Sequence, residues 1–288
     1  MFADRNPLLL AFLAIMATVA IVYSNSLQNA YTFDDHPIVE SNPVVQIGSW
    51  SDLLTSPFWP GQPELGLYRP VTLVSFALNY RMIGPGPFGF HLINILLHGL
   101  ACWLLFLVVG GLCGTRPGLV AALVFATHPV HSEAVNAIVG RADLLAGLFF
   151  LLVWYTHRRS TEGWQWRVLS AVAFGLGCFS KEHAIVLPAV LVAEDILLTR
   201  EGTIVERCRS LLREWGRYGL LAAVGVGVLA IRYIVIGHLT LPHLPDFVDN
   251  PFAHADGVDR VLSGFSVLAR YLGLAFLPVD LSVDYTFA

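Results

Sequence analysis

Two adjacent carboxylates, Asp34 and Asp35, follow the first apolar segment of the chain, in the sequence YTFDDHP of residues 31–37. Side-by-side carboxylates repel each other unless a cation, a proton or a substrate lies between them. A positioned carboxylate can also take a proton from a hydroxyl group and so act as a general base. The pair is therefore a candidate catalytic base, and a turn ahead of Pro37 with one Asp capping a backbone amide is the alternative.

Three further clusters carry cationic side chains, two of them beside acids, and each has an ordinary structural explanation when taken alone. They are Tyr68-Arg69-Pro70; His128-Pro129-Val130-His131-Ser132-Glu133 with Gly140-Arg141-Ala142-Asp143; and Ser180-Lys181-Glu182-His183. The His residues would be satisfied helix ends, and the neighbouring opposite charges would form local salt bridges. Gathered at one surface, the Arg and Lys groups would instead stabilise a departing phosphate. With an acidic base beside them, they suit sugar transfer from a polyprenyl-phosphate carrier to a hydroxyl group.

The composition indicates that these clusters are carried by membrane helices. Of the 288 residues, 56% are hydrophobic and only 13% are charged, and the mean hydropathy is +0.65. A soluble domain carries about 25% charged residues. The sequence therefore predicts an all-α integral membrane protein. A nucleic-acid-binding function is excluded, because the sequence has no basic run, no zinc-ligand spacing and no aromatic platform motif.

Eight apolar segments are expected to form the helices, and several are shorter than a full membrane span of about 20 residues. They lie near residues 8–23, 91–109, 117–128, 143–156, 168–180, 184–198, 218–236 and 261–277. Short spans between polar hairpins favour a bundle with a water-filled cavity on one side. The first segment has no A-x-A-like cleavage site after it, so we expect a retained helix rather than a signal peptide.

The arginines predict the orientation of the bundle. With a cytoplasmic N-terminus and alternating sides, ten of the 17 cations lie inside, in agreement with the positive-inside rule. These are Arg5, Arg116, Arg158, Arg159, Arg167, Arg200, Arg207, Arg209, Arg213 and Arg217. The outer face keeps Arg69, Arg81, Arg141, Lys181 and Arg260, while Arg232 and Arg270 lie in apolar segments. The positive-inside rule disfavours cations on the outer face, so we expect these five outer residues to have a function. All four polar clusters then share the outer face.

The first outer loop, about residues 24–90, is long and aromatic. It contains Trp50, Phe58 and Trp59, followed by a mixed run at 71–83 that is too short to cross the hydrocarbon. Aromatic residues at such positions favour helices that lie along the membrane interface, and a small folded cap is the alternative. The four cysteines share no metal or redox spacing, so we expect small apolar side chains without a disulfide. Arginine in place of lysine, together with abundant Ala, Gly and Leu, suggests a bacterial source.

An ordered series of motifs resembles the membrane domain of the transmembrane O-mannosyltransferases (the TMTC family) and their bacterial relatives. The motifs are FDDHPIV at 33–39 with Asn42-Pro43, YRPVT at 68–72, FHLIN at 90–94 with Leu97-His98, HPVHSEAV at 128–135 with GRADLL at 140–145, and SKE at 180–182. That family belongs to the GT-C superfamily of membrane glycosyltransferases, which also contains the protein O-mannosyltransferases. The resemblance covers nearly all of residues 1–288, which we treat as one GT-C membrane domain.

The resemblance implies a polytopic helical bundle with a large first extracytoplasmic loop carrying interfacial helices. It implies a polyprenyl-phosphate sugar as donor, dolichyl-phosphate mannose in eukaryotes, and a protein Ser or Thr hydroxyl as the usual acceptor. Within it, Asp34 is the expected base, Asp35 its helper, and transfer inverts the anomeric centre in one displacement. The expected donor-binding residues are His36, Arg69, His128, His131, Glu133, Arg141, Asp143, Lys181 and Glu182. We expect a bacterial inner membrane, or an endoplasmic reticulum membrane in a eukaryote, with the site on the extracytoplasmic or lumenal face.

Several alternatives stay open at the level of sequence. A transporter or flippase of a lipid-linked anionic sugar would use the same cations, but it would need polar groups on both faces. A GT-C enzyme could instead glycosylate a lipid or a glycan. We expect no cofactor, because the cationic side chains can neutralise phosphate; a divalent ion held by Asp34, Asp35, His131 and Glu133 is the alternative. The family's C-terminal tetratricopeptide repeats are not found in these residues and would lie beyond Ala288.

Overall fold

The computed structural model describes residues 7–199, 202–239, 254–279 and 281–282, and every regular element in these ranges is a helix. The longer helices are α1 (Pro7–Tyr23), α4 (Pro70–Ile83), α5 (Pro87–Cys113), α6 (Thr115–Thr127), α8 (Arg141–Arg158), α9 (Trp164–Ser180), α12 (Trp215–Ile236) and α13 (Gly257–Phe276). The shorter ones are α2 (Pro43–Ile47), α3 (Trp50–Thr55), α7 (Ser132–Asn136), α10 (Leu187–Glu194) and α11 (Ile204–Arg213). Four 3-10 turns, η1 (Ser24–Gln28), η3 (Pro63–Leu65), η4 (Pro129–His131) and η5 (Glu182–Val186), and two π-helical turns, η2 (His36–Glu40) and η6 (Asp195–Thr199), connect them.

The eight predicted apolar segments all fall on helices, with the sixth divided among η5, α10 and η6. Among the described residues, three helical stretches are long and apolar enough to cross a membrane: Pro7–Gln28, Pro87–Cys113 and Trp215–Ile236. A fourth candidate is a bent pair, Pro129–Asn136 with Arg141–Arg158, whose two parts meet at 116°. The prediction of an all-helical fold is therefore confirmed for the described residues, and three or four of these helical stretches are candidate membrane spans by length and composition.

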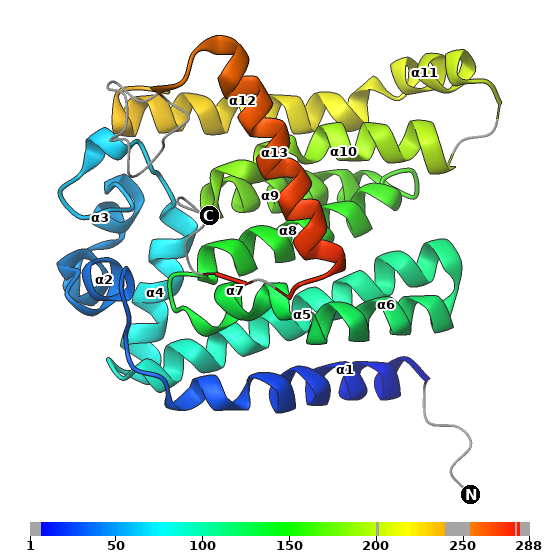
Figure 1. Ribbon diagram of the computed structural model, residues 1–288. Coiled ribbons are helices and arrows are strands. Elements are labelled where there is room, and N and C mark those ends of the chain that lie inside the picture. The colour runs from blue at the N-terminus through cyan, green and yellow to red at the C-terminus, as the bar shows by residue number, and fades with distance from the viewer. Residues whose placement is uncertain (1–6, 200–201, 240–253, 280, 283–288) are drawn as a thin grey trace, which may run out of the picture.

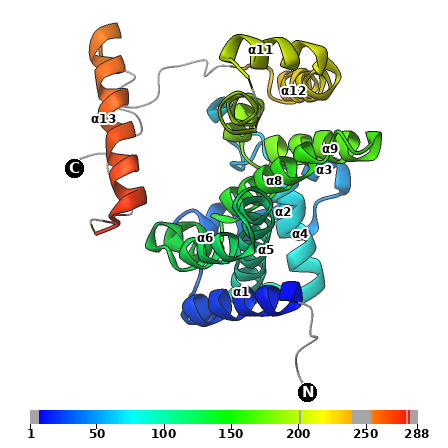
Figure 2. The same cartoon turned by 90° about the vertical axis from the view of Figure 1, so that its right-hand side faces the viewer.

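Helix α5 is the centre of the bundle, because α1, α6 and α8 all pack against it, and the stack continues from α8 through α9 to α12 (Figure 1). Helices α2, α3 and α4 gather at one end of the bundle, and α11 lies at the opposite end. Figure 2 shows α13 beside the stack rather than within it. The chain therefore places its first long loop over one end of the helices.

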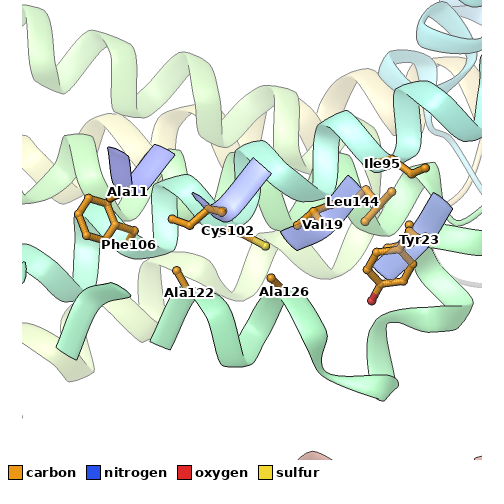
Figure 3. Close-up of a cluster of buried hydrophobic side chains, with 11 residues drawn as sticks. Ala11, Val19, Tyr23, Ile95, Cys102, Phe106, Ala122, Ala126 and Leu144 are labelled. Atoms are coloured by element: carbon orange, nitrogen blue, oxygen red, sulfur yellow. The ribbon is translucent and has the colours of Figure 1, made fainter. Parts of the chain in front are cut away.

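Three separate apolar clusters hold these helices together. The first joins α1, α5, α6 and the start of α8; Figure 3 shows its members Val19, Tyr23, Cys102 and Phe106. The second packs the first long loop around Phe58, Phe76 and Phe90, and the third joins α8, α9, α10 and α12. All four cysteines are free thiols, and Cys102 and Cys178 are buried, as the sequence predicts.

The first outer loop forms a folded cap with its own core. Helices α2 and α3 pack on α4, and Ile138 from the α7–α8 corner completes their apolar cluster. This packing matches the cap interpretation of the loop, and the position of α4 at the membrane interface stays a prediction. The loop ends at residue 86 rather than near 90, because Pro87 begins α5; proline suits the first turn of a helix, where its missing N–H has no partner to lose.

The corner between α7 and α8 leaves residues 137–140 outside both helices. Side chains replace the missing helical hydrogen bonds there: Asn94 Nδ2 donates to the carbonyls of Ala137 (2.9 Å) and Ile138 (3.4 Å). At Gly140 a Cβ atom would lie only 2.3 Å from the carbonyl oxygen of Ala134. Glycine is therefore required for the corner to close this tightly.

Arg141 begins α8 and is fully buried, at 0% exposure. Its Nε donates to Asn94 Oδ1 (2.9 Å), Nη2 to Asn79 Oδ1 (2.8 Å) and the Phe90 carbonyl (2.9 Å), and Nη1 to the Ser75 carbonyl (3.2 Å). The rings of Phe76 and Phe90 lie 4.8 and 5.4 Å from its guanidinium carbon. Arg141 thus joins α8 to α4 and α5. This burial corrects its assignment to the donor phosphate, because a phosphate cannot reach a guanidinium that has no exposed surface.

The Arg141→Met variant should lose about 3 kcal/mol of stability, because buried Asn and carbonyl oxygens would lose their donors. The measurement is the thermal unfolding midpoint of the purified protein in detergent. Arg81→Met is the matched control, since Arg81 is an exposed cation on α4 that contacts the Gly48 carbonyl and the Trp50 ring. Its stability should change by less than about 0.5 kcal/mol. Equal losses in the two variants would contradict the role assigned to Arg141.

Candidate functional site

The four polar clusters of the sequence meet at the end of the bundle that the cap covers. Asp35 accepts a hydrogen bond from the Val139 amide at 2.9 Å, which ties the first cluster to the α7–α8 corner. Glu182 accepts from Arg69 Nε at 3.0 Å, and Thr72 Oγ1 donates to the Ser180 carbonyl at 2.9 Å. Segments separated by more than 100 residues are thus in direct contact. The expectation that the clusters converge is confirmed.

A cavity of about 760 Å³ lies between these segments. Six of the predicted site residues line it: Asp34, Arg69, His131, Glu133, Asp143 and Lys181. The rest of the wall is formed by Ile38, Phe58, Trp59, Leu67, Val130, Ala134, Ala137, Val139, Gly140, Ala142 and Tyr271. We call this space the charged cavity, because both acids and cations line it.

Asp34 is the acidic residue best placed for proton transfer. Its side chain is exposed and lines the charged cavity, and among the described residues its carboxylate has no hydrogen-bond or ion-pair partner. Partial desolvation, and next the nearby charge of Asp35, raise the pKa of Asp34 above its ordinary value of 3.8. Both effects disfavour the charged form and make the carboxylate a stronger base.

The backbone before Asp34 is strained. Phe33 has a φ of +44°, the one positive φ of a non-glycine residue within the described ranges. Such a conformation costs of order 1–3 kcal/mol and persists only where surrounding contacts enforce it. Here the Asp35 amide donates to the Thr32 carbonyl at 2.8 Å and the His36 amide to the Phe33 carbonyl at 3.2 Å. These bonds hold the turn that presents Asp34.

Asp35, its neighbour, has the opposite environment. It is buried, at 1% exposure. Its Oδ1 accepts from the Val139 amide (2.9 Å), and its Oδ2 accepts from the Thr32 amide (3.1 Å) and hydroxyl (3.3 Å). Asp35 therefore fixes the turn against the α7–α8 corner. The alternative explanation of the acidic pair, in which one Asp caps backbone amides, therefore holds for Asp35.

Each cation of the cavity already has an acidic partner. Lys181 Nζ lies 2.7 Å from both carboxylate oxygens of Asp143. Arg69 donates through Nε to Glu182 at 3.0 Å, and its Nη2 lies 2.9 Å from the same carboxylate oxygen as an ion pair; Glu182 also accepts from the Tyr68 amide at 3.3 Å. The Arg69 guanidinium carbon lies 4.7 Å from the centre of the Phe58 ring. An ammonium has three N–H donors and a guanidinium has five, so both pairs leave donors for a ligand.

Three predicted residues have local roles outside the cavity lining. His128 Nδ1 accepts from the Val130 amide at 3.3 Å and caps the turn η4, as the structural explanation of this His requires. His36 pairs with Glu40 at 2.5 Å on the exposed face of η2. Glu182 holds Arg69 rather than lining the cavity. His131, in contrast, lines the cavity while its ring lies 4.1 Å from the ring of Phe125.

The sequence did not indicate the apolar part of the wall. The sequence predicts Phe58 and Trp59 to be anchors at the membrane interface and places Tyr271 within an apolar segment. In the structure, all three line the cavity. Their position between the Asp34 and Arg69 motifs is the one signal that points to Phe58 and Trp59. Among the described residues, no three His, Cys, Asp or Glu side chains are grouped as metal ligands.

Comparison with known proteins places these features in a family context. The family model described as dolichyl-phosphate-mannose-protein mannosyltransferase matches residues 69–212. The chain is 31% identical over 300 residues to protein O-mannosyl-transferase tmtc2 of Xenopus laevis, which covers 96% of the chain and 35% of that protein. It is 32% identical over 287 residues to protein O-mannosyl-transferase Tmtc1 of Drosophila melanogaster, covering 93% and 33%. Against protein O-mannosyl-transferase TMTC4 of Homo sapiens it is 32% identical over 289 residues, covering 85% and 39%.

These matches confirm the resemblance inferred from the motifs. The chain spans about a third of the length of the curated relatives it matches. No solved structure matches the chain at a significant level.

The two adjacent aspartates should respond differently to truncation. Asp35→Ala should lower the free energy of unfolding by about 2–3 kcal/mol, because buried amides of Thr32 and Val139 lose a charged acceptor. Asp34→Ala should change it by less than about 0.5 kcal/mol, since no described residue depends on that carboxylate. Thermal unfolding of both variants in the same detergent tests this difference. A larger loss in Asp34→Ala would contradict the assignment.

Proposed function

Because this chain belongs to the family of dolichyl-phosphate-mannose-protein mannosyltransferases, we propose that it is a membrane glycosyltransferase. It moves a mannose-like sugar from a polyprenyl-phosphate carrier to a hydroxyl acceptor, with protein Ser or Thr as the preferred acceptor. The observation that carries the proposal is the charged cavity, which Asp34, a carboxylate without a partner among the described residues, lines together with Arg69 and Lys181.

In the proposed reaction, Asp34 takes the proton of the acceptor hydroxyl as the hydroxyl oxygen attacks the anomeric carbon of the sugar. The bond between that carbon and the phosphate oxygen breaks, and the oxygen keeps the electron pair. The products are the glycosylated acceptor and the polyprenyl phosphate, and the proton stays on Asp34. A single displacement inverts the anomeric configuration.

Lys181 and Arg69 are proposed to stabilise the departing phosphate. Lys181 directs two of its three N–H donors to Asp143, and Arg69 uses Nε and Nη2 for Glu182. The third N–H of Lys181 and Nη1 of Arg69 remain for phosphate oxygens. Fixed donors of this kind stabilise developing negative charge without reorganising during the reaction. His131 and Glu133 are proposed to orient the sugar.

The packing of the helices supports transfer over transport. A transporter needs a polar path between the two ends of the bundle. Between those ends, α1, α5, α6 and α8 pack through one apolar cluster, and α8, α9, α10 and α12 pack through another. We place the cavity on the extracytoplasmic face of a bacterial inner membrane, because the predicted inner arginines, such as Arg158 and Arg217, lie on the helix ends away from the cap.

Asp34→Asn should reduce sugar transfer by a factor of about 10²–10⁴, the usual contribution of a general base, and leave donor binding near the wild-type level. The assay follows radiolabelled mannose from dolichyl-phosphate mannose to a Ser/Thr peptide, with donor binding measured separately. Glu64→Gln is the control, since Glu64 is an exposed acid of the same cap on η3. Full activity of Asp34→Asn would remove Asp34 as the base.

The pH dependence of transfer provides an independent test. A base acts only when deprotonated, so kcat/KM should fall as the pH drops through the pKa of Asp34. Burial and the charge of Asp35 raise that pKa, so the acidic limb should lie above 3.8. Steady-state assays across the acidic range measure the limb. An acidic limb at or below 3.8, or none, would contradict the assignment.

A further inference from the structure

Helix α11, at the end of the bundle away from the cap, has one apolar and one polar face. Ile204, Val205 and Leu212 recur at the spacing that places side chains on one side of a helix, and the free thiol of Cys208 lies between them. The three apolar side chains are between 61% and 76% exposed. Within the described part of the chain, this face is therefore not packed into a core.

The apolar surface continues onto the elements on either side of α11. Leu197 and Leu198 on η6 are exposed, and so is Trp215, the first residue of α12. Single exposed apolar side chains are normal on any protein, whereas a group of them along one segment marks an interaction surface.

The position of α11 relative to α12 indicates what this surface contacts. Helix α12 is a candidate membrane span, and one residue, Glu214, separates it from α11. Figure 2 views α12 nearly end-on, whereas α11 lies across the view. With α12 across the bilayer, α11 lies along the bilayer surface. Trp215 is then at the level of the headgroups, where Trp is enriched.

The charges of α11 favour a negatively charged surface. The helix carries three arginines and one acid, Glu206. The Glu206 carboxylate accepts from the Thr203 amide (2.8 Å) and hydroxyl (2.9 Å), so it caps the start of the helix. Arg207 Nη1 donates to the Ile196 carbonyl (2.6 Å) and holds α11 against η6. Arg209 is exposed, one helical turn from both Val205 and Leu212.

We propose that α11 binds the surface of a bilayer that contains anionic phospholipids. Ile204, Val205 and Leu212 enter the boundary between the headgroups and the acyl chains, and Arg209 binds a lipid phosphate. Amphipathic helices with basic residues bind such surfaces through apolar burial and attraction to anionic headgroups. The inference does not depend on the proposed sugar transfer.

Cys208 provides a probe at the centre of the apolar face. In Cys113→Ser it is the one exposed thiol, because Cys102 and Cys178 are buried. The protein is labelled there with a fluorophore and placed in nanodiscs of phosphatidylcholine and phosphatidylglycerol. Brominated lipid chains should quench the label, and aqueous iodide should not. A label on Arg209→Cys, combined with Cys113→Ser and Cys208→Ser, should be more accessible to iodide, because position 209 borders the apolar face.

Spin-labelled lipids measure the recognition of charge. Quenching of the Cys208 label should need about fivefold more spin-labelled phosphatidylglycerol in Arg209→Gln than in the parent protein. Spin-labelled phosphatidylcholine should quench both proteins equally. Arg116→Gln is the matched control, because Arg116 is an exposed cation at the start of α6, at the same end of the bundle (Figure 1). It should leave both titrations unchanged.

Each remaining outcome overturns the inference. Quenching of the Cys208 label by iodide alone would place the apolar face in water, and quenching by neither agent would mean that a protein surface covers it. Equal titration of the parent protein by the two spin-labelled lipids, or an unchanged phosphatidylglycerol titration in Arg209→Gln, would refute the anionic lipid. These measurements need no turnover, so a failure of the proposed function would leave them unaffected.

Discussion

The hydrogen bonds of the Asp35 carboxylate are the constraint on which the cap end of this protein depends. They join Thr32 to Val139, two positions that are distant in sequence, and so fix the cap against the corner between α7 and α8. The turn that includes the strained Phe33 is held by the same residue, and it presents Asp34 to the charged cavity. One buried carboxylate thus positions one reactive carboxylate. Asp35 therefore has a structural role, whereas its neighbour Asp34 is available for the proposed chemistry.

The charges of the cavity follow a similar logic. Arg69 and Lys181 are not isolated cations, because Arg69 forms an ion pair with Glu182 and Lys181 forms one with Asp143. An isolated cation at this depth would be costly to desolvate, whereas a paired one keeps both its charge and its direction. The acids reduce the net positive charge but orient the remaining N–H donors toward the cavity. Arg141 differs from both, since neutral oxygens accept four hydrogen bonds from its guanidinium and two aromatic rings cover it, so that it lies outside the cavity.

The sequence predicts the helices well and the roles of individual polar residues less well. Apolar segment length depends on local composition, so α1, α5 and α12 were evident from the chain alone. The convergence of the polar clusters also followed, because alternating helices place every second connection on one face. The sequence could not predict that Asp35 is buried and bonded while Asp34 is exposed, because this difference depends on the distant amide of Val139. Arg141 was assigned to a ligand since its neutral partners, Asn79 and Asn94, lie on other helices, and Tyr271 was missed because its segment reads as membrane-facing.

The bend of 116° between α7 and α8 has a consequence for how the protein assembles. Backbone groups that lie outside a helix and away from water must find partners within the protein. At the corner those partners are Asn94 on α5 and Asp35 in the cap. The bend therefore depends on two segments that precede it in the chain, and it can take this form only when both are in place.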